Sequence, residues 1–141
     1  MSAVLDTIER LLTAAQHPDI VQVYQFSDAL GGVGVVYSSD AKAFFTITTA
    51  KGVKPAELGD DLGPWKFRAN HALRLLLDLL EITQPDGWRW RTVAVDGVHN
   101  SPSGIEVAAG GQTVLLRVTS GGAKALDSNL DDFAGYTIRR V

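Results

Sequence analysis

The glycine-rich run Gly31-Gly32-Val33-Gly34 is the part of the sequence closest to a phosphate-binding loop. A dinucleotide-binding fingerprint follows a strand, and its third glycine opens a helix whose N-terminus faces the phosphates. Here the glycines precede Val35-Val36-Tyr37, which is a strand pattern, and the chain has no Gly-Lys-Ser/Thr motif. We therefore interpret the run as a hairpin loop followed by a glycine within a strand, and we predict no cofactor.

The three histidines, His17, His71 and His99, show no metal-binding spacing. Such motifs usually place two histidines at i and i+4 with a carboxylate nearby. The chain has no cysteine, which excludes thiolate zinc sites, iron–sulfur clusters and thiol nucleophiles. We predict no metal site, and we interpret His71 as a solvated residue on a polar helix face and His17 as a cation at a helix end.

Two other groups resemble hydrolytic residues only superficially. The pairs Asp60-Asp61 and Asp131-Asp132 are adjacent in sequence, but glycosidase chemistry needs two carboxyls that face each other across a cleft. Asp96, His99 and Ser101 share one loop, but Ser101 lacks the Gly-x-Ser-x-Gly turn that holds a nucleophile rigidly. We predict no catalytic residue, and we expect the protein not to be an enzyme.

Aromatic and basic residues interleave between positions 65 and 91, where five Lys/Arg stand against three Asp/Glu. Tryptophan and arginine form protein-binding hot spots, and they can also stack bases and grip phosphates. The interpretation that we favour for the side chains themselves is that the tryptophans pack between a helix and the sheet, with Arg89 and Arg91 outside. If the segment binds a partner, its candidate residues are Trp65, Lys66, Arg68, Trp88, Arg89, Trp90 and Arg91.

Composition predicts one soluble globular domain, residues 1–141. Hydrophobic residues make up 45% and charged residues 21% of the chain, and the net charge is −3. A mildly acidic protein does not attract polyanions over long range, so nucleic-acid binding is not the first expectation. The N-terminus has no basic segment followed by an apolar run, and no apolar stretch is long enough to cross a bilayer. We expect a cytoplasmic protein without a membrane contact.

The elements that must position these residues follow from hydrophobic periodicity. Apolar residues recur at helical spacing over residues 3–16, up to Pro18, and again over 65–82, where Arg74 and Asp78 are spaced to pair. Strand patterns cover 20–26, 33–37, 43–49, 88–95, 105–107, 113–119 and 136–141, and Gly110-Gly111 predicts a hairpin turn. Residues 50–64 are predicted to form a loop, and residues 129–134 a short helix.

The predicted fold is α+β, an antiparallel sheet of about six to seven strands with two main helices on one face. The element order is α-β-β-β-α-β-β-β-α-β, because the strand runs are joined by hairpin-length links. This order is similar to that of small acidic secretion chaperones and phage tail-assembly proteins in topology alone, which does not fix a function.

Three functions follow, in order of preference. The first is a non-catalytic protein-interaction domain, such as an adaptor, chaperone, immunity protein or assembly subunit, which could also self-associate through a sheet edge. The second is a small-ligand or enzymatic domain with an apolar pocket between the helix at 65–82 and the sheet, with His71 or His99 as acid or base. The residues that would line this pocket are Tyr24, Phe44, Phe45, Trp65 and Trp90. The third is a nucleic-acid-binding module.

Overall fold

The computed structural model describes residues 2–27, 30–48, 53–59, 62, 68–95 and 102–121. Its elements in chain order are α1 (Ser2–Ala14), β1 (Ile20–Phe26), β2 (Gly32–Tyr37), β3 (Lys42–Ile47), β4 (Val53–Pro55), α2 (Arg68–Thr83), β5 (Arg89–Val95), β6 (Gly104–Ala109) and β7 (Gln112–Gly121). Within these residues, neither helix is long and apolar enough to cross a membrane.

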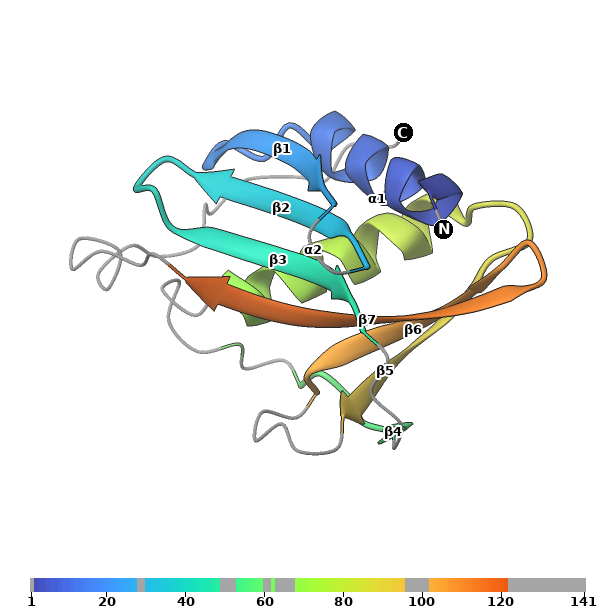
Figure 1. Cartoon of the computed structure of the whole chain (residues 1–141). Coiled ribbons are helices and arrows are strands. Elements are labelled where there is room, and N and C mark those ends of the chain that lie inside the picture. The colour runs from blue at the N-terminus through green and yellow to red at the C-terminus, as the bar shows by residue number, and fades with distance from the viewer. Residues whose placement is uncertain are drawn as a thin grey trace.

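All seven strands form one antiparallel sheet in the order β1-β2-β3-β7-β6-β5-β4. The first three strands make a meander, β5 to β7 make a second one with β4 at its far end, and β3 joins the two by pairing with β7. Both helices lie against the same face of the strongly twisted sheet (Figure 1). The predicted α+β class, strand number and helix placement are therefore confirmed.

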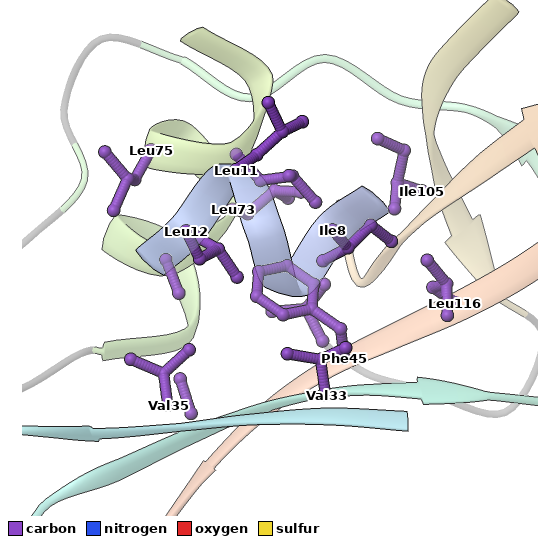
Figure 2. Packing of buried hydrophobic residues seen from close by; sticks show 14 of the residues in the cluster. Ile8, Leu11, Leu12, Val33, Val35, Phe45, Leu73, Leu75, Ile105 and Leu116 are labelled. Atoms are coloured by element: carbon purple, nitrogen blue, oxygen red, sulfur yellow. The ribbon is translucent and has the colours of Figure 1, made fainter. Parts of the chain in front are cut away.

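The core lies between the two helices and that face. α1 and α2 contribute leucine-rich stripes, as their helical periodicity predicts, and the sheet contributes alternate strand residues such as Val33, Val35, Phe45 and Leu116. Figure 2 shows Phe45 and Val33 pointing from the sheet towards Ile8, Leu11 and Leu73 of the helices. The opposite face of the sheet therefore has no helix over it in the described part of the chain.

The hairpin at Gly110-Gly111 confirms its sequence signal. Both glycines have positive φ, 59° and 80°, which a two-residue type I′ turn requires and which side chains with a Cβ adopt only at a cost. This turn fixes the β6–β7 register, and β6–β7 is the hairpin on which the second half of the sheet is built.

Three expectations need comment. Residues 50–64 are not wholly a loop, because Val53–Pro55 forms β4 and pairs with β5; three residues are too short for periodicity to reveal a strand. α2 begins at Arg68 in the described residues and runs to Thr83. The helix predicted at 129–134 and the strand at 136–141 lie outside the described residues.

Candidate functional site

Arg68 does not lie on the surface, contrary to its place among the candidate partner-binding residues. Its side chain is 0% exposed and contacts Asp19, which is 2% exposed. Arg68 is buried because it is the first residue of α2, and this helix starts against the turn between α1 and β1 rather than in solvent. Trp65 and Lys66, from the same candidate set, lie outside the described residues.

A buried polar cluster surrounds Arg68. Its Nη2 donates to Asp19 Oδ2 at 3.3 Å, and the guanidinium lies 4.7 Å from the centre of the Tyr37 ring. The Ser38 hydroxyl donates to the other carboxylate oxygen of Asp19, and the Ser38 amide donates to the Asp19 carbonyl at 2.9 Å. Burial raises the pKa of the Tyr37 hydroxyl well above its usual range; the Arg68 charge lowers it in part and Asp19 raises it further.

This cluster has the chemistry of a structural clamp. It joins the start of α2 to the α1–β1 turn and to the end of β2 through charge-assisted hydrogen bonds and a cation–π contact. A tyrosine whose pKa is raised this far is a poor general base near neutrality. Sequence reasoning did not single out Asp19, Tyr37 or Ser38, and the only local signal was the Asp19 that follows the helix-ending Pro18.

The tryptophans and arginines at positions 88–91, at the start of β5, differ in burial. Trp88 and Trp90 are half-buried and pack against the core, while Arg89 and Arg91 are exposed. This agrees with the interpretation favoured from the alternation. Arg91 also pairs with Glu106 across the β5–β6 register at 2.9 Å.

Of the five residues proposed to line a pocket under α2, the four that the structure describes do not converge. Phe45 is 0% exposed within the core, and Trp90 packs against the same core. Tyr24 and Phe44 belong to the opposite face, because Phe44 alternates with the buried Ala43 and Phe45. Core side chains from the helices and the sheet lie around Phe45 (Figure 2).

The described histidines have structural surroundings. His71 is 7% exposed, not solvated as expected, because the side of α2 that carries it turns inward. His17 Nδ1 accepts a hydrogen bond from the Asp19 amide at 3.1 Å. Within the described residues no three potential metal ligands gather. The other candidates, His99, Asp60, Asp61, Asp96, Ser101, Asp131 and Asp132, lie outside them.

The polar side of α2 holds the segment that follows β4. Arg74 donates to the Leu58 carbonyl at 2.9 Å, and Asn70 donates to the Leu62 carbonyl at 3.2 Å. Arg74 also lies 3.9 Å from Asp78, which confirms the predicted i,i+4 pair. Partial burial raises the pKa of Asp78, and Arg74 opposes the shift. The described part of the loop is thus fixed to the helix.

The face of the sheet opposite the two helices, which no helix covers among the described residues (Figure 1), is here called the open face, and it carries an aromatic cluster. Tyr24 stands opposite Gly34 and Phe26 opposite Gly32 in the β1–β2 register. A Cβ on either glycine would collide with the ring of its partner, so each ring covers the glycine beside it. Phe26 then meets Phe44 edge-on, with centroids 6.1 Å apart at 83°. The glycine run read as a loop and strand thus makes room for aromatic rings.

The open face is also basic. Register and alternation place Lys42, Arg89, Arg91 and Arg117 on it, with Glu106 as the acidic residue among the described strand positions. Among the described strand residues of this face, four cations and one anion sum to +3, whereas the full sequence, which includes residues outside the described ranges, carries −3. Arg91 is paired with Glu106; the other three cations have no carboxylate partner in the part of the chain that the structure describes.

The two edges of the sheet differ in kind. β4 is three residues long and contains Lys54 and Pro55, two of the devices by which proteins prevent further strand pairing. β1 is seven residues long and has no charged residue and no proline. Its register shifts between Ile20 and Gln22, and the residue between them, Val21, is 63% exposed.

A hollow of about 270 Å³ lies beside the β1 edge. Its walls come from the end of α1, the turn that follows α1 and the first half of β1: Leu12, Thr13, Gln16, His17, Ile20, Val21, Gln22 and Val23. Apolar side chains line it together with the Gln16 and Gln22 amides, the Thr13 hydroxyl and the His17 ring.

Comparisons with known proteins add no relative: no family model matches the chain, and neither a curated protein nor a solved structure resembles it significantly.

Proposed function

We propose that this protein is a non-catalytic protein-binding domain whose partner adds an extended segment to the edge of β1. The observation that carries the proposal is a seven-residue edge strand without charge or proline. An edge strand presents unpaired amides and carbonyls, and these groups pair readily with another strand. In the described residues β1 pairs on one side only, with β2.

The asymmetry between the edges supports this choice of site. If both edges were protected, strand addition would have no place to occur. Lys54 and Pro55 protect β4, whereas β1 combines aliphatic, aromatic and glutamine side chains and exposes Val21. These residue types are common in strands, so the composition of β1 is compatible with pairing to a further strand on its other side.

The hollow gives strand addition a means of selecting its partner. In such complexes main-chain hydrogen bonds supply affinity, and pockets for alternate side chains supply specificity. A segment lying along β1 directs every second side chain to the α1 side of the sheet, where the hollow lies between Leu12 and Val23. We expect an aliphatic side chain there, because a volume of about 270 Å³ accepts one comfortably.

An adaptor, a chaperone, an immunity protein or an assembly subunit would all use such an edge. A second copy of the chain is one further occupant, because two β1 edges can pair with each other. None of these roles requires a cofactor or a catalytic group.

The test selects binders from a random peptide library on the immobilised full chain and then synthesises the best peptide with single N-methylated amides. If the peptide forms a strand beside β1, methylation should abolish binding at alternate positions only, because alternate amides point towards β1. Val21→Lys should weaken binding about tenfold or more, equivalent to about 1.4 kcal/mol. Leu30→Lys is the matched control, since Leu30 is likewise exposed, at 49%, outside β1.

Several results would contradict the proposal. Binding that ignores every N-methyl group does not involve strand pairing. Equal losses for Val21→Lys and Leu30→Lys would move the site away from the edge. Slow hydrogen exchange at every β1 amide of the free monomer would mean that the edge is already paired. Concentration-dependent sedimentation that Val21→Lys abolishes would not contradict the proposal; it would keep β1 as the binding edge and identify a second copy of the chain as its occupant.

A further inference from the structure

We infer that the open face of the sheet is a second contact surface, which takes an acidic protein segment that carries apolar side chains. This goes beyond strand addition, because it concerns another surface and another kind of ligand. Arg89 and Arg91, which the sequence suggested for partner binding, belong to this face.

The apolar half of the site is the aromatic cluster on β1 to β3. Tyr24, Phe26 and Phe44 are all half-buried, although no helix covers them in the described residues. They remain in place because the glycines of β2 accept two of the rings and because the rings contact one another, at 6.2 Å for Tyr24–Phe26 and 6.1 Å for Phe26–Phe44. The surface is therefore formed before a partner arrives, which lowers the entropic cost of binding.

The charged half of the site surrounds Phe44. Lys42 lies two residues before Phe44 on β3, and Arg117 of β7 stands opposite Thr46, two residues after it. Residues two apart on a strand share a face and lie about 7 Å from one another. An aromatic ring thus has an exposed cation on either side, and neither cation has a carboxylate partner among the described residues.

Charge complementarity decides the kind of partner. The charges of the described strand residues on this face sum to +3 and attract an acidic group at close range, while the net charge of −3 on the whole chain repels a long polyanion. The ring geometry points the same way. Single-stranded nucleic acids stack on rings that leave a face free, whereas here the rings are half-buried and tilted by 54° and 83° against one another. An acidic segment with leucine or phenylalanine satisfies both halves of the surface.

The experiment measures fluorescence anisotropy of labelled probes with the full chain. The probes are a Glu- and Leu-rich peptide, the same peptide with Lys for Glu, the same peptide with Ser for Leu, and an oligothymidylate of similar length. The acidic apolar peptide should bind best, and added salt should weaken it. Lys42→Glu with Arg117→Glu should weaken it about tenfold or more. The matched control, Arg10→Glu with Lys54→Glu, makes the same charge change at exposed residues of α1 and β4 and should leave binding within about twofold.

Val21→Lys separates this surface from the β1 edge, since it should not weaken the acidic peptide even if it abolishes strand addition. The inference is overturned if the control pair weakens binding as much as the open-face pair, if the Lys peptide binds as well as the Glu peptide, or if no probe binds. The inference is also overturned, in favour of a nucleic-acid ligand, if the oligothymidylate binds more tightly than the acidic peptide and Lys42→Glu with Arg117→Glu abolishes that binding. If the peptide with Ser for Leu fails to bind while the Glu- and Leu-rich peptide binds, the result supports the role of the aromatic cluster.

Discussion

The buried pair of Asp19 and Arg68 gives the sharpest test of the fold. Asp19→Ala removes a carboxylate that is 2% exposed and lies 3.3 Å from a guanidinium that is 0% exposed. It also removes the acceptor of the Ser38 hydroxyl. Removing one member of a buried pair costs about 3–5 kcal/mol, because the remaining charge stays out of water.

The magnitude is large for a chain of this size. Small domains are stable by about 5–15 kcal/mol in total, so the variant should lose a large fraction of its free energy of unfolding. In thermal unfolding each kcal/mol is worth about 3–4 °C near this chain length, and the expected fall in Tm is therefore about 9–20 °C. Urea denaturation followed by circular dichroism measures the free energy directly.

The double variant Asp19→Ala with Arg68→Met separates a buried ion pair from two unrelated contacts. Because both charges are then absent, the loss should be smaller than the sum of the single losses by more than about 1 kcal/mol. The control cycle uses Arg91 and Glu106, whose side chains are 48% and 27% exposed at 2.9 Å, and its coupling should stay below about 1 kcal/mol. A loss under about 1 kcal/mol for Asp19→Ala, or additive single losses, would refute the assignment of Arg68 to the interior.

Three other predictions concern the surroundings of this cluster and the sheet. Burial raises the pKa of the Tyr37 hydroxyl in the folded chain, so the unfolded chain loses this proton at a lower pH than the folded chain does. The free energy of unfolding should therefore fall as the pH rises beyond about 10. In urea titrations, Tyr37→Phe should reduce the slope of this fall by up to about 1.4 kcal/mol per pH unit. Gly104→Ala should lower the free energy of unfolding by about 1–3 kcal/mol, because the new Cβ meets a backbone carbonyl of β7. Gly34→Ala should lower it less, because the new Cβ meets the Tyr24 ring, which can rotate outward. Equal losses of unfolding free energy in the two variants would contradict this reasoning. Arg74→Ala removes the donor to the Leu58 carbonyl and should speed proteolysis within residues 53–62 while α2 stays folded.

Periodicity predicted most of the fold because local pattern and final burial agree there. The leucines of α2 recur at helical spacing, and Leu76, Leu79 and Leu80 are fully buried in the core. The same holds for the alternation of β5, which placed Trp90 inward and Arg91 outward. Where the burial of a residue depends only on the periodicity of its own helix or strand, the sequence alone predicts that burial.

The buried polar cluster around Arg68 could not be predicted from periodicity. Its partner Asp19 lies 49 positions earlier in the chain, and an arginine at the beginning of a helix has no local feature that distinguishes a buried position from an exposed one. His71 is a similar case, because it shares its turn of α2 with Asn70 and only packing shows which of the two faces inward. The aromatic cover over Gly32 and Gly34 depends on strand register, which periodicity does not supply.

Val21 offers the clearest distinction between what the fold needs and what a function would explain. It sits at the register shift of β1 with 63% of its surface exposed, so a lysine there would displace nothing from the core. It would also shield the edge as Lys54 helps to shield β4. Packing therefore gives no reason for an aliphatic residue at this position, whereas a partner strand lying against it does. If Val21→Lys left the free energy of unfolding within about 0.5 kcal/mol while it abolished partner binding, stability and recognition would be shown to rest on different residues of the same strand.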